Sequence, residues 1–402
     1  MKKAVLLRLY WREIESILLK GLAYSDKQVT FRKNVSASKQ NESMEEYLMR
    51  KRKLLATLTV GLGLTLTLAA CGGKDKASSA DGAGDIKGNT VALVTDVGGI
   101  DDKSFNQSAW EGLQAWGKEH KVKKGKDGYN YLQSNSDSDY VTNLNTAVNN
   151  KFKTIFGIGY KLQPALEDVA KQNPDTQFGI IDTVIEGQDN VVSVVFKDHE
   201  AAFLAGVAAA MTTETKHVGF IGGQEGEVIG RFEAGFRQGV AEVDPEIKVD
   251  VQYVGSFGDP AKAKSQAAAM YNNEADIIYV AGGDSGNGVF SEAKDIMKEE
   301  GKRKVWVIGV DRDQTEEGEY SGGNLTLTST LKGVGAAVQD IANLSIEGKF
   351  PGGETLAYGL KDGAIDLTDG NLTPEVKTAI KDYKDKIIKE EIVVVEKPSQ
   401  LK

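Results

Sequence analysis

The sequence predicts an α/β protein whose parallel sheets are divided between two lobes. From residue 90 onward, short β-branched runs alternate with helix-length segments, and the connections between them are short. Repeated βα alternation favours parallel sheets covered by helices on both faces. The strand-like runs are too many for one sheet, and 402 residues exceed one compact core, so two lobes are expected.

The expected elements follow the hydrophobic pattern along the chain. Runs of apolar and β-branched residues predict strands at 90–95, 129–133, 154–158, 177–182, 191–196, 218–221, 248–254, 277–281, 304–310 and 325–330. Helical patterns lie at 104–118, 140–150, 162–172, 200–212, 229–242, 260–273, 288–300 and 333–347. The tail 387–395 ends in a β-like run that favours one more strand at a sheet edge.

The content of cysteine and histidine limits the chemistry. Cys71 is the single cysteine, which excludes an internal disulfide or a thiolate metal cluster. The three histidines, His120, His199 and His217, share no spacing typical of metal ligands or of a catalytic triad. We therefore expect no metal and no cofactor, and we expect these histidines at the surface or in lobe packing.

Charge is distributed unevenly along the chain. The formal net charge is −9, but the segment before Cys71 holds 13 Lys and Arg against 6 Asp and Glu, which leaves −16 for the remainder. Such an acidic body argues against nucleic-acid binding, which needs basic patches. It suits a protein held near an anionic membrane without lying flat on it.

The segment 49–70 has the order of a secretory signal peptide, with basic residues at 49–53 before an apolar stretch at 54–70. Since signal peptides begin close to the initiator methionine, we expect Met49, or alternatively Met44, to be the true start. Residues 1–48 would then be a misassigned upstream extension, and a genuine long N-terminal segment is the alternative.

Residues 68–72, Leu-Ala-Ala-Cys-Gly, form a lipobox at the end of this apolar stretch. The motif predicts lipidation of Cys71, and two acyl chains on that thiol would anchor the protein stably to a membrane. A transmembrane helix is the alternative, although the stretch is short and contains several Thr and two Gly. Residues 71–87 are rich in Gly, Ser, Ala, Lys and Asp, so they are expected to form a flexible tether.

One stretch, 96–110, reads as a strand end, a Gly-rich turn and a helix N-terminus. Ligands bind at such junctions in open α/β sheets, because unpaired backbone groups point into the same crevice. Asp96 can accept hydrogen bonds from hydroxyls, Ser104 is a plausible N-cap, and Phe105 can cover a planar ring. The alternative is an ordinary βα loop with a Phe in the core.

The segment 96–113 resembles the N-terminal signature of the basic membrane lipoprotein family, the substrate-binding lipoproteins of ABC transporters that include the purine nucleoside receptor A proteins. Four further segments match in the expected order, at 180–182, 255–262, 281–288 and 308–314. The resemblance implies the type I periplasmic-binding-protein fold, in which two Rossmann-like lobes with parallel sheets are joined by a hinge around a ligand cleft. We expect lobe one at 88–213 plus about 325–348, and lobe two at 214–324 plus about 349–402.

A nucleoside needs aromatic faces for its base and acceptors for its hydroxyls. The resemblance assigns the base to Phe105 of lobe one and Phe257 of lobe two, and assigns the ribose hydroxyls to Asp311. Lys332 would supply a donor on the same side, and Asp182 would read a polar edge of the base. Asp96 and Asn106 would complete the lobe-one face, and the turn with Gly282 and Gly283 would let the backbone approach the ligand. Asp284 stands in this turn where the family usually has a small hydroxyl residue.

The leading expectation is a non-enzymatic, lipid-anchored protein that binds a purine nucleoside and delivers it to an ABC permease in the same membrane. Crowded carboxylates would repel a phosphate, which favours nucleosides over nucleotides. Riboflavin or a sugar is an alternative ligand in the same fold. An enzyme acting on nucleosides is a further alternative, although no nucleophile–base pair is evident. A sensory receptor that signals through a partner is the last.

Overall fold

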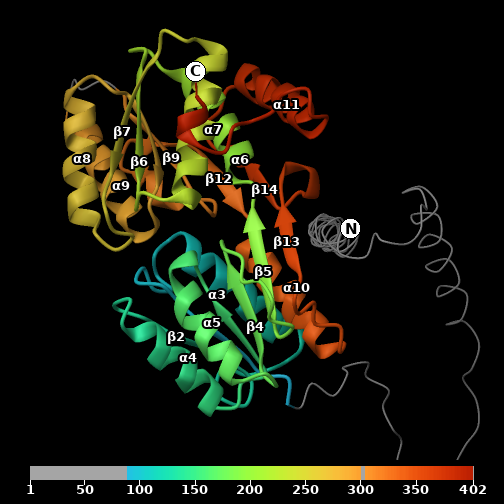
Figure 1. Ribbon diagram of the computed structural model, residues 1–402. Helices are drawn as coiled ribbons and strands as arrows, with labels where there is room; N and C mark the ends of the chain where they lie inside the picture. The colour runs from blue at the N-terminus through green and yellow to red at the C-terminus, as the bar shows by residue number, and fades with distance from the viewer. Residues whose placement is uncertain (1–87, 300–303, 402) are drawn as a thin grey trace, which may run out of the picture. The chain divides into compact units, whose positions relative to one another are not determined.

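The computed structural model describes residues 88–299 and 304–401. These residues belong to one compact unit, and Figure 1 shows two lobes in it, each built around its own sheet. The expected upstream extension, signal peptide, lipidation site at Cys71 and tether lie outside the described residues. No helix among those residues is both long and apolar enough to cross a membrane.

The first lobe contains a six-stranded, fully parallel sheet in the order β13-β5-β4-β3-β1-β2. Helices α4 and α5 pack on one face through an apolar core, and α3 and α10 pack together on the other. The elements are β1 (Val91–Val94), α3 (Phe105–Glu119), β2 (Tyr129–Leu132), α4 (Asp139–Asn149), β3 (Thr154–Gly157), the 3₁₀ turn η1 (Tyr160–Leu162), α5 (Gln163–Gln172), β4 (Gln177–Ile181), β5 (Val191–Phe196), α10 (Val334–Ile346) and β13 (Thr355–Tyr358).

The second lobe has a six-stranded sheet in the order β14-β12-β9-β8-β6-β7, in which only β14 is antiparallel to its neighbour. Helices α8 and α9 cover one face, α6 and α7 the other, and α11 packs on α6. The elements are α6 (Asp198–Thr212), β6 (His217–Gly222), α7 (Glu227–Val243), β7 (Lys248–Tyr253), α8 (Pro260–Asn272), β8 (Ile277–Ala281), η2 (Gly283–Ser285), α9 (Gly286–Lys298), β9 (Trp306–Gly309), η3 (Glu316–Gly318), the hairpin β10 (Glu319–Tyr320) and β11 (Gly323–Asn324), β12 (Thr326–Lys332), η4 (Leu360–Asp362), β14 (Ile365–Leu367), α11 (Pro374–Ile388) and η5 (Pro398–Gln400).

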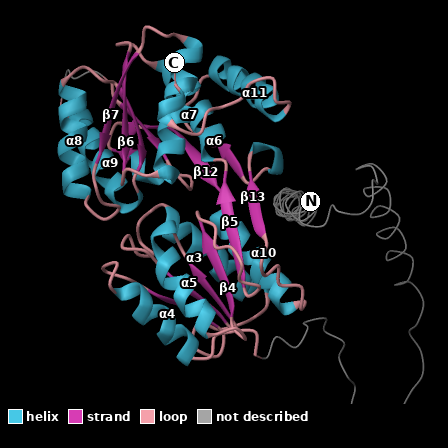
Figure 2. Cartoon of the chain, in the orientation of Figure 1, coloured by secondary structure: helices cyan, strands magenta, loops and turns pink. Residues whose placement is uncertain are grey.

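The chain passes between the lobes three times, after β5, after β12 and after β13, and Figure 2 shows these strands where the lobes meet. The crossings are tied together by backbone hydrogen bonds from Lys197 to Tyr358 and from Gly333 to Ala364. The expected lobe boundaries are therefore wrong in three places. Helix α6 and strand β12 belong to the second lobe, and β13 belongs to the first, because each crossing occurs at the end of a strand.

The expected edge strand at the end of the tail is also absent from the described residues. The segment after α11 lies along α7 instead, where Gln238 donates to the carbonyl of Val393 and accepts from the amide of Val395. A side-chain amide thus satisfies the backbone groups that a neighbouring strand would have paired. Figure 1 places this end of the chain beside α7.

Candidate functional site

A cavity lies between the lobes, at the carboxyl ends of the parallel strands. It encloses about 550 Å³ of space free of protein atoms, its open mouth included. Every residue that the sequence analysis proposed for ligand binding lines it: Asp96, Phe105, Asn106 and Asp182 from the first lobe, and Phe257, Gly282, Gly283, Asp311 and Lys332 from the second. Residues separated by more than two hundred positions are thus brought to one site.

The first-lobe face is built around a buried carboxylate network at the start of α3. Asp96 Oδ1 accepts from the amide of Gly98 at 2.9 Å and from Asn106 Nδ2 at 2.7 Å. Asp102 accepts from the backbone amides of Ser104, Asn106 and Gln107. Ser104 therefore occupies the expected N-cap position of α3, but Asp102 supplies the capping oxygens. The Ser104 side chain makes no capping bond and donates instead to Asp311 Oδ2 across the cleft.

Burial dominates the electrostatics of the cavity. It raises the pKa of Asp96 to about 6, although hydrogen bonds from Gly98 and Asn106 act in the opposite direction. Burial also raises the pKa of Asp311 to about 7, against the lowering effects of Lys332 and of the Ser104 hydroxyl. A ligand that donates hydrogen bonds to these carboxylates would stabilise their ionised form.

Two of the cavity carboxylates have strained backbones in equivalent places. Asp182 follows β4 with φ 71°, and Asp311 follows β9 with φ 67°. Non-glycine residues rarely adopt this left-handed conformation, although Asp tolerates it better than most. Such strain is concentrated at functional sites, because the surrounding structure must hold it in place. Each lobe therefore presents one strained aspartate at the end of a central strand.

Lys332, at the end of β12, is a buried cation between two carboxylates. Its Nζ lies 2.7 Å from Asp182 Oδ2 and 3.1 Å from Asp198 Oδ1. Burial lowers the pKa of this ammonium, but Asp182, Asp198 and Asp311 outweigh burial and raise it, so Lys332 is charged. The donor expected beside Asp311 is thus engaged mainly with Asp182. The second oxygen of Asp182, Oδ1, is buried and has no hydrogen-bond partner among the described residues.

Aromatic side chains line both lobes of the cavity. The Phe257 ring meets Tyr160 edge to face, with centroids 6.2 Å apart and planes at 78°. The Phe105 ring centroid is 5.2 Å from Lys332 Nζ, and Phe232 lies at 5.5 Å from the same atom. The predicted clamp of Phe105 and Phe257 is therefore supplemented by Tyr160 and Phe232.

The glycine turn after β8 approaches the cavity as expected. Gly283 has φ +58°, and a Cβ there would lie 3.4 Å from the carbonyl oxygen of Phe257. Asp284 does not line the cavity; its Oδ1 accepts from Asn287 Nδ2, which also donates to the carbonyl of Asp102 in the other lobe. The unusual residue in this turn therefore organises the cleft edge and leaves the ligand side to Gly282 and Gly283.

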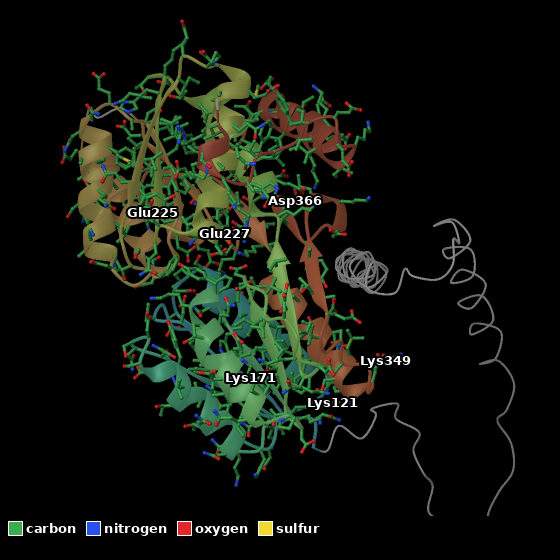
Figure 3. The ribbon with its side chains drawn as sticks, viewed as in Figure 1. Lys121, Lys171, Glu225, Glu227, Lys349 and Asp366 are labelled. Carbon is green, nitrogen blue, oxygen red and sulfur yellow. The ribbon has the colours of Figure 1, made fainter. Side chains whose placement is uncertain are left out.

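Several lining residues were missed by the sequence analysis: Asp102, Gly159, Tyr160, Lys161, Val228, Ile229, Phe232, Ala281 and Val310. Val228, Ile229 and Phe232 belong to the first turns of α7, where they read as ordinary apolar positions of an amphipathic helix. Figure 3 marks the start of this helix at Glu227, on the part of the second lobe nearest the first. In the sequence, the only feature that marks these three positions is the charged turn at 225–227 directly before them.

The histidines take no part in the site. His120 Nε2 lies 2.7 Å from Asn343 Oδ1, His217 Nε2 lies 2.8 Å from Asp250 Oδ2, and His199 is buried in α6. Within 88–299 and 304–401, no group of His, Cys, Asp and Glu could hold a metal ion. The chemistry that the cavity offers is hydrogen-bond acceptance, aromatic contact and one buried ammonium.

Comparisons with known proteins give a consistent result. A family model described as ABC transporter substrate-binding protein PnrA-like matches residues 89–397. The CD4+ T-cell-stimulating antigen of Listeria monocytogenes is 49% identical over 357 residues, which cover 87% of this chain and 100% of that protein. The ABC transporter nucleoside-binding protein BmpA of Lactococcus lactis is 48% identical over 354 residues, which cover 86% and 100%.

Among solved structures, an ABC transporter solute-binding protein from Aeropyrum pernix matches with a TM-score of 0.69 and 25% identity. The match covers 77% of this chain and 94% of that one. It confirms the predicted α/β fold of a two-lobed periplasmic binding protein.

Proposed function

This chain belongs to the family of PnrA-like ABC transporter substrate-binding proteins, and we propose that it binds a purine nucleoside in the interlobe cavity for uptake by an ABC permease. The observation that carries the proposal is the convergence of aromatic rings and carboxylates from both lobes on one cavity. The printed name of the Lactococcus lactis relative, a nucleoside-binding protein, supports the same ligand class.

The lining matches the chemistry of an uncharged ligand rich in donors. The carboxylates of Asp96, Asp182 and Asp311 accept from ribose hydroxyls and from N–H groups of a base edge. Asp182 Oδ1 is a buried acceptor that receives no hydrogen bond from the described residues. Base stacking on an aromatic side chain contributes about 1–3 kcal/mol, and Phe105 and Phe257 supply two such faces. A phosphorylated nucleoside would meet repulsion from these carboxylates.

Anchoring through lipid on Cys71 is part of this proposal. Two acyl chains would keep the protein on the extracytoplasmic face of the cell membrane, and the segment 72–87 would let the binding lobes reach the permease. Radiolabelled palmitate should label the wild-type protein in cells and should not label Cys71→Ala. Equal labelling of the variant would contradict the anchor.

The ligand assignment is tested by calorimetric titration of the purified protein with purine nucleosides, pyrimidine nucleosides, riboflavin and ribose. We expect tight binding of purine nucleosides that Phe105→Ala and Asp311→Ala each weaken at least tenfold, the loss of about 1.4 kcal/mol or more. Asp369→Ala, which changes a side chain that is 90% exposed, should bind like the wild type.

Two outcomes would redirect the assignment. Binding of riboflavin or ribose without nucleosides would move it to another ligand of the same fold. Release of free base from inosine or guanosine, detected by chromatography, would indicate an enzyme acting on nucleosides.

A further inference from the structure

Asp198 is the most deeply buried carboxylate beside the cavity that does not line it. Its side chain is 1% exposed, and it opens α6 directly after the crossing from β5. Its Oδ1 lies 3.1 Å from Lys332 Nζ, and its Oδ2 accepts from Arg231 Nε at 3.4 Å. Asp198 therefore connects a cavity residue to an arginine on α7.

The ammonium of Lys332 is shared between carboxylates of different lobes. Asp182 ends a strand of the first sheet, whereas Lys332, Asp198 and Arg231 all belong to the second lobe. A hinge motion that separates the lobes would remove Asp182 from the ammonium and leave Asp198 beside it. In that open arrangement, Asp198 would remain the ion-pair partner of Lys332.

Three aromatic rings surround the buried ammonium of Lys332. Its Nζ lies 5.2 Å from the ring centroids of Phe105 and Phe196, and 5.5 Å from that of Phe232. A buried ammonium without a carboxylate beside it is costly, because aromatic faces offset only part of its lost hydration. A carboxylate that stays beside Lys332 would therefore fix the position of the ammonium before the ligand binds.

We propose that Asp198 is a positioning residue for ligand binding, which holds the Lys332 ammonium at the cavity wall so that it meets Asp182 when the lobes close. Arg231 fixes the second oxygen of Asp198 and so fixes the direction of the carboxylate. Asp198 touches no ligand and acts only through Lys332. The inference rests on the proposed function, since the effect is measured as nucleoside affinity.

The test is a double-mutant cycle with Asp198→Asn and Lys332→Met, read by calorimetric titration of the full-length protein with inosine and guanosine. Asn keeps the shape of the side chain and removes its charge, and Met removes the ammonium. We expect Asp198→Asn to weaken binding about tenfold, the scale of one lost charge-assisted interaction. In the Lys332→Met background the same substitution should have no further effect.

Asp276→Asn is the matched control, because Asp276 is also buried and accepts hydrogen bonds from Thr213 and Glu214 after α6. It precedes β8, at the opposite end of the strand from the cavity-lining Ala281. The substitution should lower the unfolding temperature and leave affinity unchanged. If Asp198→Asn does not fold, Arg231→Gln replaces it in the cycle, with an expected loss of about threefold that again vanishes without Lys332.

The outcomes separate the inference from the proposed function. Absence of nucleoside binding by the wild-type protein would overturn the function itself. Normal binding by the wild type, together with an unchanged affinity of Asp198→Asn or an equal loss in the Lys332→Met background, would overturn the role of Asp198 alone.

Discussion

At the scale of single residues, the positions most visible in the sequence were those at the ends of apolar strands. Asp182 and Asp311 each follow a buried run, where a charge is costly unless it faces a cleft, and both line the cavity. Ser104 shows what the sequence pattern alone does not reveal. Its position fits an N-cap, but only the fold reveals that Asp102 takes the amides and that Ser104 reaches Asp311 in the other lobe.

The raised pKa of Asp311 predicts a pH dependence of affinity. The carboxyl has a pKa of about 7 without ligand, and donated hydroxyl hydrogen bonds would lower this pKa on binding. The complex would therefore hold fewer protons, and affinity should fall as the pH drops below 7, by up to about tenfold per pH unit. Calorimetric titration with inosine at pH 8 and at pH 6.5 measures the change.

Asp311→Asn should bind at least tenfold more weakly at pH 8 and should lose most of this dependence. Asn tolerates the left-handed backbone at this position, so the fold is expected to survive. The chosen range stays above the pKa of about 6 of Asp96, which limits its contribution. A variant that kept the full wild-type dependence would contradict the assignment to Asp311.

At the scale of elements, the long periodic segments were predicted well and the short ones were not. Strand β14 has three residues and pairs antiparallel at a sheet edge, so neither its length nor its pattern marks it. Strand β13 is partly exposed, and helix α11 has only three buried residues, so both lack a strong apolar signal. The apolar tail after α11 packs on a helix, which period-two patterning cannot distinguish from a strand.

The close packing of α6 and α7 predicts a specific sensitivity to glycine substitution. A Cβ on Gly239 would lie 2.0 Å from the carbonyl oxygen of Phe203, so the backbones of the two helices would have to separate. We expect Gly239→Ala to lower the free energy of unfolding by about 1–3 kcal/mol, despite the better helix propensity of Ala. Denaturant unfolding followed by circular dichroism gives the value.

Gly230→Ala in the same helix is the control. A Cβ at this position meets only Pro398 Cδ at 3.5 Å, an ordinary contact, so the substitution should be neutral or stabilise the helix by up to about 1 kcal/mol. Equal destabilisation by both variants would show that the helix contact is not the cause.

At the scale of the whole molecule, polar contacts join the lobes at the edge of the cavity. Gln314 Nε2 donates to the carbonyl of Lys103 at 2.8 Å, Asn287 Nδ2 to the carbonyl of Asp102 at 3.3 Å, and Arg312 pairs with Glu111 at 3.1 Å. All of them connect α3, or the loop that precedes it, with the second lobe. Sequence patterns cannot reveal such pairs, because the partners lie about two hundred residues apart and two of the three acceptors are backbone carbonyls.

These contacts describe a closed arrangement, and Gln314 offers the sharpest test of its role in ligand capture. Its Oε1 accepts from the amide of Val310 within the second lobe, whereas its Nε2 bonds to Lys103 in the first. Gln314→Glu keeps the first acceptor and replaces the cross-lobe donor with an oxygen that repels the Lys103 carbonyl. Gln266→Glu is the matched control, since Gln266 Nε2 donates to the carbonyl of Tyr253 inside the second lobe alone.

If closure retains the ligand, Gln314→Glu should weaken inosine affinity about five- to tenfold through faster release, because fewer contacts favour the closed state. Small-angle scattering in saturating inosine should also show a larger radius of gyration for Gln314→Glu than for the wild type or Gln266→Glu. Equal affinities and equal radii for the two variants would mean that the lobes are held together by the ligand and the hinge, without help from this contact.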